Sequence, residues 1–304
     1  MSDFWEEKKV AITGGSGLIG TPMIRKLESM GAKVRNLDLP TWDITNMQAM
    51  MDGLVCDICI HLAAMSHVEE TRDNGLSAWE INVRGTWVVL EACLRKGVSA
   101  VVTASSNHVY GLQDSFPVPE TAQLNQLDTY SVSKICMDYI TRAYTHNYGL
   151  KTAVIRNTNC YGPEDPHSSH IIPGTILSLL EGRVPVIKST GLVKKGYLYV
   201  DDVVDAYLLV AENLFQYGKS GSPPGGWVFN AGAPPISSQD LVRMIMSLLP
   251  VHTYPIIQEN PTDQHDEQMD SSKLEALGWR PKYSLKEGLA KTIEWFREDA
   301  KVPA

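Results

Sequence analysis

Short apolar runs alternate with segments of helical periodicity through the first two-thirds of the chain. Residues such as 77–97 and 133–149 carry apolar positions at the three- and four-residue spacing of a helix. Near-continuous apolar strands separated by helices are typical of a parallel sheet that helices cover on both faces. We therefore predict an α/β fold with a doubly wound parallel sheet, the Rossmann fold. Its predicted strands span residues 8–13, 33–38, 55–63, 100–105, 151–157 and 226–232.

The pattern changes after Asn157, where proline and glycine cluster in "NCYGPEDPHSSHIIPG" and in "YGKSGSPPGGW". Helices are expected to start near Ser271 and Ser284, and "SLKE" has the Ser-x-x-Glu form in which each side chain caps a backbone amide. We predict a smaller, mostly helical C-terminal lobe. The doubly wound domain is expected to comprise residues 1–158 and 194–232, and the lobe residues 159–193 and 233–304.

Composition narrows the function classes. The 304-residue chain is 43% hydrophobic, enough for a large core, and its net charge of −8 comes without a basic cluster. We therefore expect no nucleic-acid partner. No apolar run approaches the roughly 20 residues that cross a bilayer, so no membrane partner is expected. Five cysteines spread through apolar segments indicate reduced thiols in a cytoplasmic protein. No metal-ligand spacing joins the eight histidines, and no metal site is predicted.

A glycine-rich loop follows the first predicted strand. Gly14, Gly17 and Gly20 have the spacing G-x-x-G-x-x-G, which permits a tight turn, close approach of a phosphate, and close packing of the next helix. The second strand ends at Asp38, whose carboxylate can accept hydrogen bonds from ribose hydroxyls and would repel a 2′-phosphate. The expected cofactor is NAD. Asp43 and Ile44 follow closely and either border the adenine or belong to a solvated loop.

Tyr130 and Lys134 lie four residues apart at the start of a predicted helix, hence on one face. A phenol ionises near pH 10, but an ammonium one turn away and the positive nicotinamide ring both favour the phenolate. Tyr130 can then take a hydroxyl proton while a hydride leaves the same carbon. Ser106, at the carboxyl end of the fourth strand, is placed to hydrogen-bond that oxygen.

These motifs resemble the NAD-dependent nucleotide-sugar epimerase/dehydratase family of extended short-chain dehydrogenases/reductases. The middle of the chain most resembles the branch that contains CDP-glucose 4,6-dehydratases. The resemblance covers nearly the whole chain and rests on "TGGSGLIG" (13–20), "HLAA" (61–64), "NVRGT" (82–86), "SSNHVYG" (105–111), "YSVSK" (130–134), "RNTNCYGP" (156–163), "YLYVDDVVDAY" (197–207) and "GWRP" (278–281).

The resemblance implies a role for each matching position. Ser106, Tyr130 and Lys134 would be the catalytic set, with His108 beside them, and the C-terminal lobe would bind a nucleotide sugar. Lys195 falls where most members have a phosphate-binding arginine, so the diphosphate contact is expected to be either looser or rebuilt elsewhere. A homodimer is expected through helices at about 77–96 and 130–148. Further cofactor contacts would come from Leu18, Ile19, Leu62, Ala63, Ala64 and Asn82, and substrate contacts from Ser106, Asn107, Asn159, His170 and Lys195.

Asn107 and His108 bear on the choice of reaction. Dehydratases of this family place an acidic pair, or Asp with Lys, after the catalytic Ser or Thr; asparagine has no proton to release. His108 is either an acid–base group or a structural histidine. C4 epimerisation through a transient 4-keto sugar needs only Ser106 and Tyr130 and is our first hypothesis. The alternatives are 4,6-dehydration, net oxidation with release of NADH, and a non-catalytic NAD-sensing protein.

The loop that enters the predicted lobe contains His167 and His170. The sequence leaves two interpretations open for them, because they either line the sugar pocket or face solvent.

Overall fold

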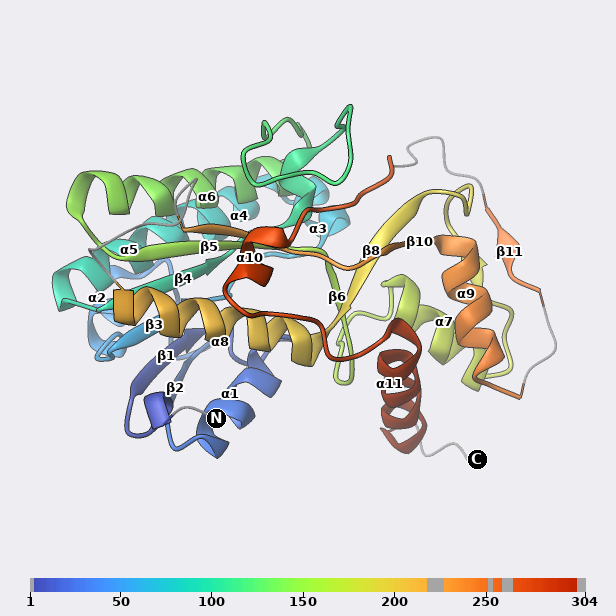
Figure 1. Ribbon diagram of the computed structural model, residues 1–304, viewed down its shortest axis with the longest axis horizontal. Coiled ribbons are helices and arrows are strands. Elements are labelled where there is room, and N and C mark those ends of the chain that lie inside the picture. The colour runs from blue at the N-terminus through green and yellow to red at the C-terminus, as the bar shows by residue number, and fades with distance from the viewer. Residues whose placement is uncertain (1–2, 218–226, 251–253, 259–264, 300–304) are drawn as a thin grey trace.

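A six-stranded parallel sheet forms the centre of the computed structural model, which describes residues 3–217, 227–250, 254–258 and 265–299 (Figure 1). Its strand order is β2-β1-β3-β4-β5-β9, so the direction of winding reverses between β1 and β3. Ligands bind such sheets beyond the carboxyl ends of the strands at this reversal. The predicted Rossmann fold is confirmed. The strands are β1 (Lys9–Thr13), β2 (Lys33–Leu37), β3 (Ile58–His61), β4 (Ala100–Ala104), β5 (Thr152–Asn157) and β9 (Val228–Ala231).

Helices cover both faces of this sheet (Figure 1). On one face, α1 (Gly20–Ser29) and α8 (Val200–Tyr217) bury apolar side chains against the strands. On the other, α2 (Met47–Gly53), α5 (Gly85–Lys96) and α6 (Thr129–Tyr148) form a second core. Burial on both faces explains why the strands are apolar at nearly every position.

A smaller set of elements lies at the carboxyl end of the sheet, on the right of Figure 1. Three short strands pair in the order β10-β8-β6, and β7 pairs with β11. Helices α7, α9 and α11 pack with them in a third core. The elements are β6 (Asn159–Tyr161), α7 (Ile171–Leu180), β7 (Val186–Ile187), β8 (Lys194–Tyr199), β10 (Pro235–Ser237), α9 (Ser238–Ser247), β11 (Ile256–Ile257) and α11 (Leu285–Asp299).

The two predicted C-terminal helices are present. α10 (Ser272–Ala276) begins beside Ser271, and α11 begins after Ser284. The backbone N–H of Ser284 donates to the Glu287 carboxylate at 2.8 Å, and the Glu287 N–H donates to Ser284 Oγ at 3.3 Å. This reciprocal pair is the predicted capping box. Leu274 and Trp279 pack into the core of the main sheet, although the sequence assigns them to the smaller lobe.

Two predicted elements differ in their bounds. The strand expected over 55–63 is regular only over Ile58–His61, and the following residues leave the sheet as a loop. The helix expected over 77–97 is divided into α4 (Gly75–Ala78), a π-helical turn (Trp79–Arg84) and α5. Such π turns are frequent at functional sites. The remaining elements are α3 (Val68–Asp73) and two 3₁₀ turns, Asp3–Trp5 and Asn107–Tyr110.

Across the described ranges, no helix has both the length and the apolar character that crossing a membrane requires.

Candidate active site

A cavity of about 1190 Å³ opens at the carboxyl edge of the main sheet, beside the smaller set of elements. It exceeds the usual size for one small ligand, about 300–1000 Å³, so it has room for a cofactor together with a substrate. Every site residue expected from the sequence lines it except Asn82. The fold thus brings together segments that lie far apart in the sequence.

The glycine loop forms one end of the cavity between β1 and α1. Gly14 has φ = +71°, and a Cβ there would lie 2.7 Å from the backbone nitrogen of Ala63. A Cβ on Gly20 would lie 2.5 Å from the Gly14 carbonyl oxygen. Glycine is therefore required at both positions, and Gly17 leaves the loop open to the cavity. Amides at the start of α1 can hold a pyrophosphate here, together with lining residues Leu18 and Ile19.

Asp38 follows the end of β2 on the wall of the same cavity. Its carboxylate accepts hydrogen bonds from the backbone N–H of Ser16 at 2.9 Å and of Leu39 at 3.0 Å. This fixes a negative charge next to the glycine loop, where the adenine ribose of a dinucleotide would lie. The donor set fits NAD, because a 2′-phosphate would meet this carboxylate.

Asp43 and Ile44 also line the cavity. The Asp43 carboxylate accepts from the backbone N–H and the hydroxyl of Thr45, both at 2.8 Å, so it stabilises a local turn. Ile44 is buried, and its side chain fills the space where Gly85 lacks a Cβ. Of the two, only Ile44 gives the cavity an apolar wall.

Asn82 acts from behind the cavity. It is fully buried in the π-helical turn, and its Oδ1 accepts from the Met65 N–H at 2.7 Å. Its Nδ2 donates to the Met65 carbonyl at 3.0 Å and to Ser133 Oγ at 2.8 Å. Asn82 therefore holds the loop after β3, which contains Leu62, Ala63 and Ala64, against the helix that contains Tyr130 and Lys134. Its predicted help in placing the cofactor would be indirect.

Ser106, Tyr130 and Lys134 meet on the opposite wall. Each is buried, with 5%, 8% and 4% of its surface exposed. Burial raises the pKa of the Tyr130 phenol above its ordinary value, while a hydrogen bond with Ser106 opposes this shift. Burial lowers the pKa of the Lys134 ammonium to about 8, and its Nζ donates to the Ala104 carbonyl at 3.2 Å. The phenol is therefore protonated until further positive charge enters the cavity.

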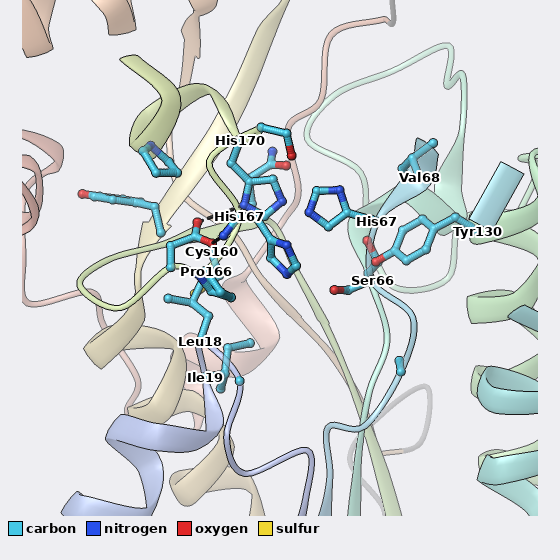
Figure 2. Close-up of a pocket in the computed structure, with 18 of the residues that line it drawn as sticks. Leu18, Ile19, Ser66, His67, Val68, Tyr130, Cys160, Pro166, His167 and His170 are labelled. Carbon is cyan, nitrogen blue, oxygen red and sulfur yellow. Dashed lines mark hydrogen bonds and ion pairs between the residues drawn. The ribbon is translucent and has the colours of Figure 1, made fainter. Parts of the chain in front are cut away.

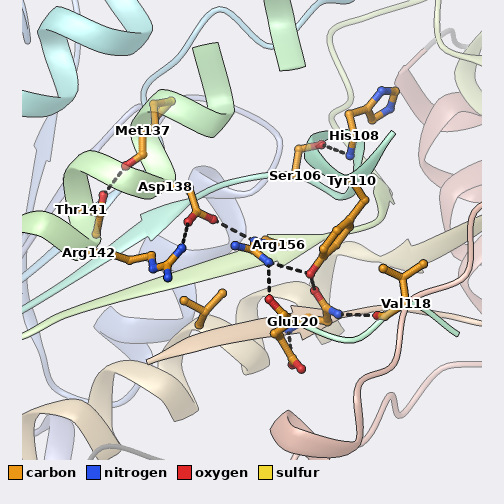
Figure 3. A network of polar contacts seen from close by, with 12 residues as sticks. Ser106, His108, Tyr110, Val118, Glu120, Met137, Asp138, Thr141, Arg142 and Arg156 are labelled. Atoms are coloured by element: carbon orange, nitrogen blue, oxygen red, sulfur yellow. Dashed lines mark hydrogen bonds and ion pairs between the residues drawn. The ribbon is translucent and has the colours of Figure 1, made fainter. Parts of the chain in front are cut away.

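A buried polar network supports the turn after Ser106 (Figure 3). The Arg156 guanidinium, 1% exposed, donates to the Asp138 carboxylate at 2.8 Å and to the Tyr110 hydroxyl at 2.8 Å. Tyr110 OH in turn donates to Asn230 Oδ1 at 2.6 Å. The network joins α6, β5 and β9 to the 3₁₀ turn that begins at Asn107. It thereby fixes the distance between Ser106 and the helix that contains Tyr130.

Asn107 and His108 meet a carboxylate from the distant end of the chain. Asn107 Nδ2 donates to Glu267, and Lys195 Nζ lies 3.6 Å from the other oxygen of that carboxylate. His108 packs edge-to-face on Tyr130 with ring centroids 5.7 Å apart. Burial lowers the pKa of His108, and the Glu267 charge partly opposes this shift. His108 is therefore neutral at neutral pH.

The remaining predicted substrate residues lie on the far wall. Asn159 Nδ2 donates to the Gly196 carbonyl at 3.1 Å, which ties β6 to β8. His170 precedes α7, and its Nδ1 lies 2.9 Å from Asp165 Oδ2. Figure 2 shows His170 with His167 and His67 on the side of the cavity that faces Tyr130.

Two cavity features have no local signal in the sequence. Glu267 is 160 residues from Asn107, and His67 lies in a loop that was expected to belong partly to a strand. Only the resemblance of neighbouring motifs places their segments near the site. Among the residues with described coordinates, no group of three or more metal-ligating side chains is placed to hold a metal ion.

A glycine loop, an acidic residue after the second strand, and a Ser/Tyr/Lys set in one cavity define a dinucleotide-dependent dehydrogenase-type enzyme. The sequence profile of the NAD dependent epimerase/dehydratase family matches residues 10–232. The chain belongs to this family, which confirms NAD as the predicted cofactor and the predicted class of enzyme.

Known proteins similar to this chain include 4,6-dehydratases and 4-epimerases. It is 29% identical to a dTDP-D-glucose 4,6-dehydratase of Bos taurus, over 96% of this chain and 89% of that protein. The structure of a UDP-glucose 4-epimerase from Thermotoga maritima, determined with UDP-glucose, superposes with a TM-score of 0.88 at 27% identity, covering 96% of this chain and 99% of that one. The structure of a dTDP-glucose 4,6-dehydratase from Streptomyces venezuelae, determined with NAD, superposes with a TM-score of 0.85 at 26% identity. It covers 96% of this chain and 98% of that one.

Proposed function

We propose that the protein epimerises a nucleotide sugar at C4 through a transient 4-keto intermediate. The observation that carries the proposal is the meeting of Ser106, Tyr130 and Lys134 in one cavity with the glycine loop, while Asn107 occupies the position next to the serine. Similar proteins named as 4-epimerases and as 4,6-dehydratases support the shared first step. Epimerisation requires no acid beside Ser106 and matches these residues best.

In the proposed mechanism, Tyr130 transfers a proton, while Ser106 and Lys134 stabilise the groups that exchange it. Bound NAD would supply the hydride acceptor and the positive ring that lowers the pKa of the Tyr130 phenol. Tyr130 takes the proton of the C4 hydroxyl, and Ser106 donates a hydrogen bond to the same oxygen. Lys134, one helical turn from Tyr130, stabilises the phenolate by its charge. After the ketone turns over in the cavity and C4 regains on its other face the hydride that the cofactor would hold, Tyr130 returns the proton to the oxygen.

A second candidate, 4,6-dehydration, is favoured by Glu267. This reaction needs a base for the C5 proton and an acid for the departing C6 hydroxyl. The Glu267 carboxylate accepts from the Asn107 amide and lies close enough to His108 to affect its pKa, so an imidazole and a carboxylate are present where the sequence lacks an acidic pair. Glu267 does not itself line the cavity, so we rank dehydration second.

The nucleotide is left open among UDP, dTDP and CDP. The CDP branch is included because the middle of the chain resembles CDP-glucose 4,6-dehydratases. The Asn159 and Lys195 side chains on the far wall are our proposed contacts to the diphosphate. We also retain the proposed division into a Rossmann domain of residues 1–158 and 194–232, and a nucleotide-sugar lobe of residues 159–193 and 233–304.

The proposal is tested by incubating the NAD-loaded enzyme with UDP-, CDP-, GDP- and dTDP-sugars. Product analysis by NMR should show the C4 epimer of one of them and no accumulated NADH. Tyr130→Phe should lower turnover by about 10²–10⁴-fold, the usual contribution of a general base, while nucleotide-sugar binding persists. Full turnover by Tyr130→Phe, or no reaction with any sugar nucleotide, would contradict the proposal.

We further propose a homodimer through α5, α6 and the π-helical turn. Trp79, Trp87 and Tyr139 are 38%, 40% and 54% exposed on these elements, so they offer aromatic surface to a partner copy. Sedimentation should show a dimer that Trp87→Lys weakens. A monomeric wild-type protein would contradict this part of the proposal.

A further inference from the structure

Three histidines that the mechanism does not use meet on the wall of the cavity (Figure 2). His67 lies just before α3, whereas His167 and His170 lie in the loop before α7. The ring centroid of His67 is 4.0 Å from that of His167 and 4.7 Å from that of His170, with which it stacks at an interplanar angle of 4°. Segments about a hundred residues apart thus bring three imidazoles into contact.

The hydrogen bonds of this histidine cluster are incomplete. Asp165 engages only one side of it: Oδ2 lies 2.9 Å from His170 Nδ1, and Oδ1 accepts from the His167 backbone N–H at 3.1 Å. His67 Nε2 is buried and has no hydrogen-bond partner within the described part of the chain. A buried polar atom without a partner costs free energy, and a bound group that enters between the rings would satisfy it.

The electrostatics of the cluster couple the binding of an anion to the uptake of protons. Burial, together with repulsion from its two imidazole neighbours, lowers the pKa of His67, and burial and His170 lower that of His167. The acidic groups that face them are Glu70 on α3 and Asp165. An anion placed among the rings would reverse the repulsion and draw protons onto them.

Three other cations of the cavity wall have carboxylate partners. Lys195, which the sequence predicts to contact a diphosphate, lies 3.6 Å from Glu267 in a largely buried pair. Arg72 pairs with Asp73 at 3.5 Å, and Arg183 pairs with Glu181. Much of the positive charge that a nucleotide diphosphate would need is therefore offset.

We propose that His67, His167 and His170 form a binding site for anionic oxygens of the substrate. The chemistry suits phosphate oxygens of the nucleotide or a carboxylate on the sugar. The inference rests on the proposed function for the identity of the substrate, but the site itself depends only on the three histidines. Binding takes up protons, so affinity increases as pH falls.

The test is calorimetry with UDP-, CDP- and dTDP-glucose in a Tyr130→Phe background that blocks turnover. The sugar-linked diphosphate does not titrate between about pH 6 and 8, so a pH effect reports on the protein. Binding should tighten about tenfold as pH falls from about 8 to about 6, with uptake of protons. A His67→Gln/His167→Gln/His170→Gln variant should lose this gain in affinity at low pH. His146→Gln, an exposed change at the opposite end of α6, is the matched control.

A second arm identifies the source of the anion. If UDP-glucose and UDP-glucuronate lose equal affinity in the triple variant, the cluster binds the diphosphate. If only UDP-glucuronate loses affinity in the triple variant, the cluster binds the sugar carboxylate. The single variant His67→Asn keeps two of the three rings and should lose part of the gain in affinity at low pH. It provides a second test of the site in case the triple variant misfolds.

The inference is overturned if the triple variant keeps wild-type affinity and pH dependence, since the cluster would then only pack the two loops together. Inorganic pyrophosphate, added to the NAD-loaded proteins so that the glycine loop is already occupied, separates this failure from failure of the proposed function. If no nucleotide sugar binds, the proposed function fails, while pyrophosphate that binds the wild type and not the triple variant at about pH 6 still supports the histidine site. Pyrophosphate that binds both proteins equally overturns it.

Discussion

At the scale of single residues, the carboxylate of Glu267 lies against Asn107 and 3.6 Å from Lys195, although these residues come from three distant segments. If the enzyme is an epimerase, this carboxylate orients Asn107 and offsets the lysine charge without taking part in proton transfer. If it is a dehydratase, the same carboxylate is the missing acidic partner of His108. Its replacement separates the two reactions.

We expect Glu267→Gln to leave kcat unchanged and to lower KM, because Lys195 loses its partner and becomes available to a substrate phosphate. Steady-state kinetics with the best sugar nucleotide measures both constants. The matched control is the neighbouring Asp266→Asn, because the exposed Asp266 carboxylate accepts, among the described residues, only from the Lys194 backbone N–H. A drop in kcat of about 10²-fold or more would show acid–base catalysis and favour dehydration.

Asp38 decides between the two dinucleotides. Replacing it with asparagine keeps a hydrogen-bond acceptor for the Ser16 N–H but removes the charge that repels a 2′-phosphate. The ratio of the NADP to the NAD dissociation constant should fall about tenfold, as expected for loss of one close charge contact. Fluorescence titration measures the ratio. Asp52→Asn, an exposed change outside the cavity at a carboxylate that accepts from Gln48, should leave the ratio unchanged. An unaltered ratio in Asp38→Asn would refute the assignment.

At the scale of elements, the buried network of Figure 3 holds the site together from behind. Arg156→Met leaves the Asp138 carboxylate, which is fully buried, without its main partner. Removal of one member of a buried pair costs about 3–5 kcal/mol of unfolding free energy. Urea denaturation should show this loss. The Arg142 side chain, which is 46% exposed, is a second partner of the same carboxylate. Its replacement in Arg142→Met should lower the unfolding free energy by only about 0–1 kcal/mol. Equal effects of the two variants would contradict the assignment.

The sequence predicted those elements whose signals are local. Gly14 and Gly20 are required by contacts within one strand–turn–helix unit, and Ser284 and Glu287 cap one helix turn. The predicted strand over 55–63 is longer than β3. Apolar residues before and after a strand end look alike in the sequence, whether they pair in the sheet or line a cavity. The π-helical turn around Asn82 was missed, because it is stabilised by a distant backbone segment.

The candidate site was predictable in its catalytic half and not in its substrate half. Ser106, Tyr130 and Lys134 occupy positions that the fold always brings to one edge of the sheet. Glu267 and His67 depend on how the smaller elements dock, and no periodicity or spacing encodes that contact. Their positions came only from the structure.

At the scale of the whole molecule, burial of neutral histidines links the fold to pH. His61 is fully buried, with ring nitrogens 2.7 Å from Thr13 Oγ1 and 3.1 Å from Thr86 Oγ1. Thr86 Oγ1 donates to the Asn82 carbonyl and therefore accepts from His61, which holds the ring in a neutral tautomer. Burial lowers its pKa to about 3.

The unfolded chain therefore binds a proton near pH 6.5 that the folded protein binds only near pH 3. Unfolding free energy should fall as pH drops through this range, by about 1.4 kcal/mol per pH unit from His61 alone. Urea denaturation at several pH values measures the slope, which His61→Asn should reduce. The exposed His146→Gln should leave it unaltered, and an equal slope in His61→Asn and wild type would contradict the account.

The cavity also explains how one molecule can hold a cofactor and a sugar together. The glycine loop and Asp38 line one end, the Ser/Tyr/Lys set lines the middle, and the smaller elements close the far wall. Each set comes from a different part of the chain, so hydride chemistry and substrate recognition can vary independently. This separation is consistent with similar proteins of which one is named a 4,6-dehydratase and another a 4-epimerase.

The most direct test of the central claim is the fate of deuterium placed at C4 of the nucleotide sugar that the enzyme turns over. Mass spectrometry and NMR of the product locate the label. Our account predicts that the deuterium remains at C4 of the epimer, with no label from solvent and no accumulated NADH. Deuterium at C6, with a solvent hydrogen at C5, would show dehydration, and label in released NADH would show net oxidation. Either result would contradict epimerisation.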